Sequence, residues 1–138
     1  TDIAGPFNAI AKVAADVHIY PTARILIPWN LDIGKHTAIG DRVTLYALGK
    51  IRIGERVTVS QGAHLCAGTH EWRDPSMPLI KSSIQVLDDA WICADAFVGP
   101  DVTIGNRVIL GARAVALRSI EDDAIAIGNP AKVVARRE

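Results

Sequence analysis

The sequence predicts an all-β solenoid, in which short parallel strands stack into coils, and two observations favour this fold class. An aliphatic residue recurs at every sixth position, a period that neither a helix nor a simple strand alternation produces. Aromatic residues make up only 5% of the chain, although 49% of it is hydrophobic. Such small apolar side chains suit thin stacked layers better than one large globular core. The aliphatic positions are Ile19, Ile25 and Leu31; Ile33, Ile39, Leu45 and Ile51; Ile53, Val59 and Leu65; and Val86, Ile92, Val98, Ile104 and Leu110.

Each six-residue unit is expected to form one flat strand followed by a corner. Three units close a triangular coil, and stacked coils bury one aliphatic ladder along each edge. The span from Ile19 to Leu110, without the interruption described below, corresponds to about five coils. Glycine often follows the aliphatic residue, as at Gly34 and Gly54, and it is expected where the backbone turns or approaches a neighbour closely. A small or β-branched residue at the fifth position lets the chain turn.

The chain of 138 residues is expected to form a single domain, 1–138. Residues 1–16 precede the period and are expected to be irregular. The solenoid is expected over about 17–120, with a protruding loop at 71–83. Residues 121–138 leave the period and contain a Gly-Asn-Pro turn, so we expect a short C-terminal cap, with a short helix as one way to finish it.

Composition excludes several classes of function. Lys plus Arg (15) equals Asp plus Glu (15), so no basic excess indicates a nucleic-acid partner. No apolar run approaches the roughly 20 residues of a membrane span. The first residues lack the pattern of a signal peptide. Cys66 and Cys93 are too few for a disulfide framework. We therefore expect a soluble, cytoplasmic protein.

The period stops just after His70, where the segment "EWRDPSMPLIKSS" (71–83) follows. The sequence indicates that His70 is the last residue of a regular unit in which Thr69 is the corner residue. Loops that interrupt a regular scaffold often carry function. An inserted loop without a role is the alternative, and a lone surface histidine is more often inert. The residues alone leave both readings open.

The chain resembles the hexapeptide-repeat acyltransferases over roughly residues 17–135. Among them it is most similar to acetyltransferases of colanic acid and other exopolysaccharide biosynthesis, through "YPTARI" (20–25), "PWNL" (28–31), "LCAGTH" (65–70) and "GNPAKVV" (128–134). The resemblance implies a left-handed parallel β-helix, whose handedness the spacing does not reveal because parallel crossovers are normally right-handed. It also implies a homotrimer with active sites between subunits.

The activity implied by the resemblance is acetyl-CoA-dependent O-acetylation of a sugar or glycan precursor, by direct transfer without a covalent enzyme intermediate. His70 matches the family's general base, a task that suits imidazole because such side chains titrate near neutral pH. In the sugar acetyltransferases an Asn helps to bind the acceptor, but the matching stretch here, "AIGDRVT" (38–44), has none. Asn30 is the nearest alternative. Trp72 and Glu71 are further acceptor-binding candidates, and Glu71 could also orient the imidazole.

The donor side follows from the same resemblance. Small and apolar residues at family positions would line the narrow pantetheine arm, and cations would bind the CoA phosphates, for which arginine offers a bidentate fork. A solvated basic tail is the alternative for each cation. Leu117 stands where the sugar acetyltransferases often have Thr, and Arg136 lies one place beyond the matching basic position. The cofactor-binding candidates are Trp91, Ala94, Ala112, Leu117, Arg118, Lys132 and Arg136.

Three other functions remain open at this point. The enzyme could acetylate the nitrogen of an amino sugar, or the solenoid could bind a ligand or scaffold a complex without catalysis. A zinc hydratase of the same fold would need a cluster of histidines. His64 and His70 lie one repeat apart, but two imidazoles alone make a poor zinc site, so no metal is expected. Neither the acceptor nor the group that orients His70 is evident from the residues.

Overall fold

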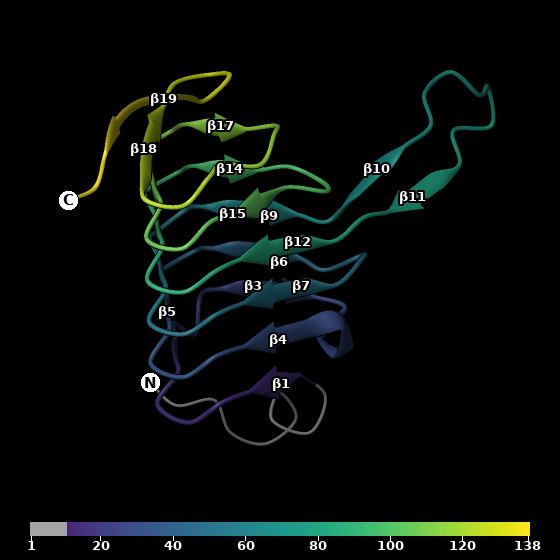
Figure 1. The fold of residues 1–138 in the computed structure, drawn as a ribbon. Coiled ribbons are helices and arrows are strands. Elements are labelled where there is room, and N and C mark those ends of the chain that lie inside the picture. The colour runs from purple at the N-terminus through teal and green to yellow at the C-terminus, as the bar shows by residue number, and fades with distance from the viewer. Residues whose placement is uncertain (1–10) are drawn as a thin grey trace.

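In the computed structural model, which describes residues 11–138, the chain winds into a three-sided solenoid of about six turns (Figure 1). Each turn contributes one short strand to each of three parallel sheets. Sheet 1 contains β1 (Lys12–Val13), β4 (Leu31–Ile33), β7 (Ile51–Ile53), β12 (Ile84–Val86) and β15 (Thr103–Ile104). Sheet 2 contains β2 (His18–Ile19), β5 (Ala38–Ile39), β8 (Thr58–Val59), β13 (Trp91–Ile92), β16 (Ile109–Leu110), β18 (Ala124–Ile127) and β19 (Lys132–Arg136). Sheet 3 contains β3 (Arg24–Leu26), β6 (Thr44–Tyr46), β9 (His64–Cys66), β14 (Phe97–Val98) and β17 (Val115–Ala116).

The six-residue period predicted the core correctly. The aliphatic residue of each unit points inward and stacks on the equivalent residue of the next turn, as Ile33 does on Ile53 and Ile53 on Val86. Ile25, in the first complete turn, is only partly buried. The small and β-branched corner residues are buried as well, including Val43, Ala63, Ala96, Val102 and Ala114. One narrow apolar column therefore runs through the whole solenoid.

The glycines of the repeat serve close approach rather than the turn itself. A Cβ atom on Gly34 would lie 2.7 Å from the carbonyl carbon of Gly54 in the next turn. The left-handed backbone conformation at the corners belongs mostly to other residues, such as Arg56 (φ 54°) and Asp89 (φ 62°), and Gly62 (φ 73°) is the corner glycine that adopts it among the described residues. Glycine is needed where two turns touch, and the corners tolerate a side chain that points into solvent.

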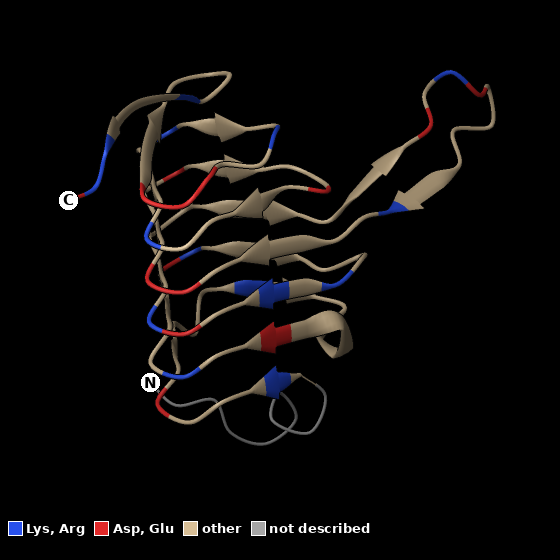
Figure 2. Ribbon diagram, viewed as in Figure 1, with Lys and Arg blue, Asp and Glu red and all other residues tan. Residues whose placement is uncertain are grey.

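The corner at which the chain passes from sheet 1 to sheet 2 is lined with charged residues, and we call it the charged corner. Figure 2 shows acidic and basic residues alternating along it, on the left of the view. The guanidinium of Arg56 donates two hydrogen bonds to the carboxylate of Asp89, at 2.8 and 3.1 Å. One turn further, Arg107 donates to Asp123 at 2.8 Å. Opposite charges thus meet between consecutive turns.

Side-chain oxygens on the same corner also accept backbone N–H groups of the preceding turn. Asp88 Oδ1 accepts from the N–H of Glu55 at 2.8 Å, and Asn106 Oδ1 accepts from that of Asp88 at 3.1 Å. Asp122 Oδ1 accepts from the N–H of Asn106 at 2.7 Å. These bonds satisfy turn donors that no sheet ladder reaches.

A two-stranded arm projects from the opposite corner, between sheets 3 and 1 (Figure 1). It consists of β10 (Gly68–His70) and β11 (Leu79–Lys81), which pair antiparallel with His70 opposite Leu79. The sequence indicated that the coil continued to His70 with Thr69 as its corner residue. In the structure Thr69 is exposed and pairs with Ile80, so the chain already leaves the coil at Gly68.

The neck of the arm is tightly packed. The N–H groups of Gly49 and Ser82 both donate to the carbonyl of Ala67, at 2.8 and 3.2 Å. A Cβ on Gly49 would lie only 2.0 Å from the carbonyl oxygen of Ser82, and one on Gly68 would lie 2.5 Å from the Leu48 side chain. These contacts hold the arm against the coil on which it is mounted.

The C-terminal cap is a strand hairpin and not a short helix. β18 continues sheet 2 in parallel with β16, and β19 then folds back antiparallel on β18. An uncovered edge strand would leave a row of N–H and C=O groups unpaired, and the β-branched Val133 and Val134 favour a strand there.

At the other end of the solenoid, β1 pairs in parallel with β4, inside a segment that was expected to be irregular. This additional strand, together with the continuation through β18, accounts for about six turns where about five were expected. Residues 1–10 lie outside the described part of the chain. Within residues 11–138 the helix is a single 3-10 turn, η1 (Pro28–Asn30), and no helix is long and apolar enough to cross a membrane.

Candidate active site

His70 lies on the first strand of the arm, with an exposed side chain. Its Nδ1 atom is 2.7 Å from the carbonyl oxygen of Met77, on the returning side of the arm. A carbonyl oxygen can only accept a hydrogen bond, so Nδ1 must carry the proton. In the neutral ring the proton on Nδ1 leaves Nε2 with a free lone pair, and an Nε2 of this kind can accept a proton.

The tip of the arm is held by its own hydrogen bonds. The N–H of Glu71 donates to the carbonyl of Pro78 at 2.9 Å, and that of Met77 donates to the carbonyl of Asp74 at 2.8 Å. The Asp74 carboxylate accepts from both the N–H and the hydroxyl of Ser76, at 2.9 Å each, and these bonds lower the pKa of Asp74. The segment that presents the Met77 carbonyl is therefore an ordered turn.

Glu71 does not orient the imidazole in this structure. Its carboxylate accepts from the N–H of Arg73 at 3.0 Å and lies 3.6 Å from the Arg73 guanidinium. Arg73 in turn lies over the ring of Trp72, 4.6 Å from its centre. The indole of Trp72 is otherwise open, with 69% of its surface exposed. Among the described residues, neither of these acceptor-binding candidates on the arm forms a hydrogen bond with the ring of His70.

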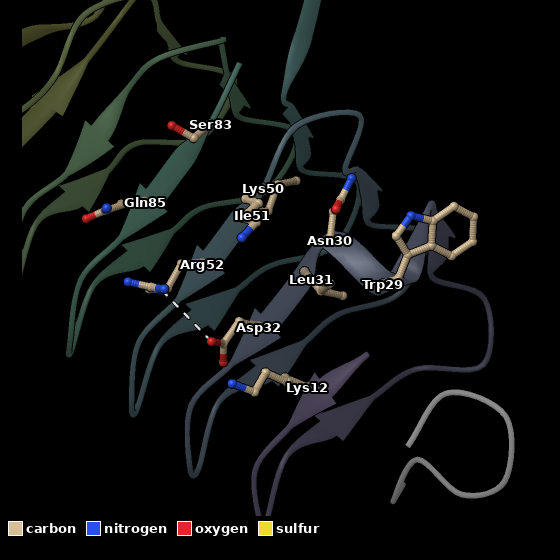
Figure 3. A pocket seen from close by; sticks show the side chains of 10 residues that line it. All are labelled: Lys12, Trp29, Asn30, Leu31, Asp32, Lys50, Ile51, Arg52, Ser83 and Gln85. Atoms are coloured by element: carbon tan, nitrogen blue, oxygen red, sulfur yellow. Dashed lines mark ion pairs between the residues drawn. The ribbon is translucent and has the colours of Figure 1, made fainter. Parts of the chain in front are cut away.

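Asn30, the third acceptor-binding candidate, lies away from the arm's tip, at the end of η1. Its side-chain Nδ2 donates to the carbonyls of Ala47 and Leu48, at 3.0 and 3.1 Å, in the corner of the next turn. Both amide hydrogens are therefore used inside the fold, and only Oδ1 remains for a ligand. Asn30 lines a hollow of about 340 Å³ on sheet 1, close to the root of the arm (Figure 3).

Three donor-side candidates come together at the C-terminal end of the solenoid. Leu117, Arg118 and Lys132 line one hollow of about 440 Å³, together with Pro130 and Ala131. The first two follow β17 and the others lead into β19, so the cap closes this hollow against the last turn. An apolar wall with two cations at its rim can accept a narrow chain that carries phosphates.

The other donor-side candidates lie elsewhere on the chain. Trp91 is on β13 of sheet 2, where its Nε1–H donates to the Ser60 hydroxyl at 2.9 Å. Ala94 and Ala112 occupy turns that follow β13 and β16. Arg136 belongs to the cap: its guanidinium lies 3.3 Å from the carboxylate of Glu121 and donates to a backbone carbonyl. Within one chain these residues do not line the hollow at Leu117.

His64 and Cys93 are a histidine and a cysteine whose pKa values depart from their ordinary values. His64 is half-buried on β9, packs edge-on against the ring of Phe97 at 5.4 Å between centres, and has its pKa lowered chiefly by burial. Burial raises the pKa of the Cys93 thiol. Among residues 11–138 no group of three or more His, Cys, Asp or Glu side chains is arranged to hold a metal ion.

The Met77 carbonyl is the site group that the sequence could not indicate. It is a backbone atom, so its residue type says nothing about it. It meets His70 only because the arm folds back on itself, and the antiparallel pairing of β10 with β11 was not predicted.

The chain is similar to known proteins in both sequence and fold. It matches no protein-family model. It is 36% identical over 127 residues to the protein of Escherichia coli (strain K12) named colanic acid biosynthesis acetyltransferase WcaF, an alignment that covers 92% of this chain and 70% of that protein. In fold it is similar to a maltose O-acetyltransferase from Clostridium difficile 630, with a TM-score of 0.89, 22% identity, and coverage of 96% and 73% of the two chains.

A second solved structure is a hexapeptide-repeat-containing acetyltransferase from Vibrio cholerae in complex with acetyl coenzyme A. It has a TM-score of 0.89 and 22% identity, and the match covers 96% of this chain and 74% of that chain. At this identity the likeness concerns the fold. The solenoid is the left-handed parallel β-helix that the resemblance implied.

Proposed function

Because this chain belongs to the hexapeptide-repeat acetyltransferases, in the family of WcaF, we propose that it transfers an acetyl group from acetyl-CoA to a hydroxyl group of a sugar or glycan precursor. The observation that carries the proposal is the hydrogen bond between His70 Nδ1 and the Met77 carbonyl. It selects the tautomer in which Nε2 can act as a base, on an exposed imidazole whose position is fixed by an ordered arm.

The reaction begins with acetyl-CoA and the acceptor bound together. His70 Nε2 removes the proton of the acceptor hydroxyl, and the oxygen attacks the thioester carbonyl. As the imidazole becomes a cation, its Nδ1–H bond to the Met77 carbonyl gains strength, because charge-assisted hydrogen bonds are stronger than neutral ones. The Met77 carbonyl thus stabilises the charge that develops on the base.

The tetrahedral intermediate carries a negative oxygen and needs a preorganised donor, most simply a backbone N–H. Collapse of this intermediate expels the CoA thiolate. The protonated His70 then gives its proton to the departing sulfur, and the neutral imidazole is restored. The acetyl ester and free CoA are the products, and no covalent intermediate on the enzyme is required.

Acetyl-CoA is proposed to bind at the C-terminal end of the solenoid. The hollow formed by Leu117, Arg118 and Lys132 offers an apolar wall for the pantetheine arm and two cations for the CoA phosphates. Trp91, Ala94, Ala112 and Arg136 stay candidates for contacts with the same substrate. They lie on other surfaces of a single chain, so their participation depends on how chains assemble.

We further propose that the enzyme is a homotrimer with active sites between subunits. The arm carries four exposed apolar side chains, namely Trp72, Met77, Leu79 and Ile80. An isolated chain would leave this apolar surface in water, which is typical of an interaction site. Sedimentation equilibrium should give three times the mass of one chain, and a monomer at working concentration would contradict the assembly.

The decisive experiment replaces His70 and compares hydroxyl with amine acceptors. His70→Ala should lower kcat for the hydroxyl acceptor by about 10²–10⁴-fold, the range expected for loss of a general base, with an unchanged melting temperature because the side chain is exposed. His36→Ala is the matched control and should retain activity, because it removes an exposed imidazole at the charged corner, away from the arm. Wild-type turnover by His70→Ala would exclude the proposed base. Faster transfer to the amine analogue than to the hydroxyl would assign N-acetylation instead.

A further inference from the structure

The hollow at the root of the arm is built from two columns of outward-pointing side chains (Figure 3). The first column follows the strand register of sheet 1, in which Lys12 lies opposite Asp32, Asp32 opposite Arg52, and Arg52 opposite Gln85. The second column lies two residues earlier in the chain, just before each strand begins, where Asn30, Lys50 and Ser83 line the same hollow. Such stacking places functional groups at successive steps of about 4.8 Å, the spacing of paired strands.

The hollow has an excess of positive charge. Three cations line it, Lys12, Lys50 and Arg52, against one carboxylate, Asp32, which gives a local net charge of two positive units on a chain whose formal net charge is zero. The Arg52–Asp32 pair is long, at 3.9 Å, and solvent-exposed, so it neutralises Arg52 weakly. Among the described residues, the ammonium groups of Lys12 and Lys50 make no hydrogen bond or ion pair.

The same hollow offers what a sugar ring requires. Trp29 stands at its edge with 68% of its surface exposed, so an apolar face is available for the C–H side of a pyranose. The Ser83 hydroxyl, the Gln85 amide and Asn30 Oδ1 can hydrogen-bond to ring hydroxyls. An apolar surface with a few convergent polar groups is the usual composition of a small-molecule site.

The hollow also has a direct connection to the arm. Ser83 lies two residues beyond the end of β11, and Lys50 follows Gly49, which packs against the neck. A saccharide bound here can therefore extend along the arm that carries His70. This part of the inference rests on the proposed function, whereas recognition of an anion by the hollow does not.

We propose that this hollow binds an anionic group of the acceptor, and that the enzyme consequently prefers acidic or phosphorylated glycans to neutral ones. Lys50 and Arg52 are the principal anion-binding residues, because Arg52 lies on β7 and Lys50 on the corner before it, next to the strand β12 that follows the arm. Lys12 lies on β1, two strands further from the arm. A carboxylate of a uronic acid and a phosphate of a glycosyl phosphate present the same charge-assisted chemistry to these cations.

The first test uses three acceptors that share the glucose ring: methyl glucoside, methyl glucuronide and glucose 1-phosphate. We expect kcat/KM for at least one anionic acceptor to exceed that for the neutral one by about tenfold or more, in line with a charge-assisted contact. Lys50→Gln and Arg52→Gln should reduce this preference to within about threefold, and added salt should reduce it in the wild type. The glucuronide and phosphate arms identify which anion is preferred.

Lys35→Gln is the matched control, since it removes one exposed charge at a corner away from the hollow and should leave the preference unchanged. The second test measures binding of the preferred anionic saccharide by calorimetry to His70→Ala without acetyl-CoA. Binding that survives His70→Ala but is lost in Arg52→Gln supports the anion site even if His70 is not the base. Equal affinity in wild type and Arg52→Gln, or a change of oligomeric state in Arg52→Gln, would overturn the proposal and assign the cations to another role.

Discussion

The charged corner and the corner that bears the arm occupy equivalent places in the repeat, yet they differ in almost every physical respect. At the charged corner, carboxylates and guanidinium groups from consecutive turns pair with one another, as Arg56 does with Asp89, and side-chain oxygens accept turn N–H groups. At the other corner the chain leaves the solenoid at Gly68 and exposes Trp29 and Trp72. At the charged corner, polar and charged groups find their partners within the same chain. The arm-bearing corner leaves aromatic side chains exposed, where a ligand or another subunit can contact them.

The comparison suggests a division of roles between the two corners. The charged corner joins consecutive turns, and the arm-bearing corner carries the candidate site. A corner repeated without interruption joins each turn to the next through short-range pairs. An interruption at one corner does not disturb the apolar column, since Val86 still stacks on Ile53 across the insertion. The solenoid therefore accommodates the inserted arm without a break in its core. Three experiments test this separation.

The largest effect is expected from shortening the arm. Replacing residues 72–77 by Asn-Gly, between Glu71 and Pro78, keeps β10 and β11 but removes the Met77 carbonyl that fixes the tautomer of His70. Because Asn-Gly favours a two-residue hairpin turn, the strands should still pair. We expect kcat/KM to fall by about a hundredfold, a loss typical of disturbed general-base catalysis.

Because no core residue lies in the removed segment, the melting temperature of the shortened protein should stay within a few degrees of that of the wild type when both have the same oligomeric state. Differential scanning calorimetry and steady-state kinetics would measure the two effects on the same sample. Wild-type activity would mean that the Met77 carbonyl does not orient the base. A large loss of stability would contradict the independence of the solenoid from its arm.

An intermediate effect is expected at the neck, where the two regions meet. Gly49→Ala would place a Cβ 2.0 Å from the Ser82 carbonyl oxygen, and the obstructing atom is backbone. Overpacking of this kind should lower the free energy of unfolding by about 1–3 kcal/mol, and it should lower activity as well by displacing the arm. Gly99→Ala is the matched control, because its Cβ would meet the nearest atom at 3.3 Å. Urea denaturation of both variants measures the difference, and equal stabilities would show that the neck is less rigid than described.

The smallest effect is expected at the charged corner. The hydrogen bond from Arg56 lowers the pKa of Asp89, so the folded state holds this carboxylate ionised at a pH where the unfolded chain takes up a proton. The stabilisation is present above the ordinary aspartate pKa of about 4 and is lost as pH falls through the lowered value. Asp89→Asn should lower the melting temperature at pH 7 by about one to three degrees, and this difference should shrink below about pH 4.

Asp101→Asn provides the control for that experiment. Asp101 also has a left-handed backbone (φ 63°), but it lies at the arm-bearing corner and makes no ion pair among the described residues. Asparagine tolerates this conformation as well as aspartate does. A melting temperature that changes equally with pH in both variants would show that the Arg56–Asp89 pair contributes nothing specific.

Much of the scaffold could be predicted from residues close together in the sequence. The inward position of Leu45 or Leu110 follows from its six-residue spacing, since each unit repeats the same strand and corner. The structure of the cap was harder to predict from the sequence. β19 forms a strand because it pairs with the open edge of β18, and this depends less on its own residues. The point at which the arm leaves the coil was misplaced by a few residues, because "GTH" satisfies the repeat pattern while its backbone pairs with β11.

For the candidate site too, the sequence indicated individual residues, whereas their arrangement came only from the structure. His70 was proposed through a motif, and Leu117, Arg118 and Lys132 were proposed singly, without any indication that they would share one hollow. Glu71 was the only orienting group that a side-chain motif could offer. The structure supplies a backbone carbonyl instead, which no sequence pattern records.

The sequence by itself determined the repeating unit and the apolar column, because each depends on interactions within six residues or between identical units. It placed the interruption only to within a few residues. The tertiary structure alone decided which groups face one another across turns. Lys12, Asp32 and Arg52 form one wall of a hollow because the register of stacked strands aligns them, and Met77 meets His70 because the arm folds back. Contacts between residues far apart in the chain depend on the register of the stacked strands and on the folding back of the arm. Both are properties of the assembled coils rather than of any single repeat.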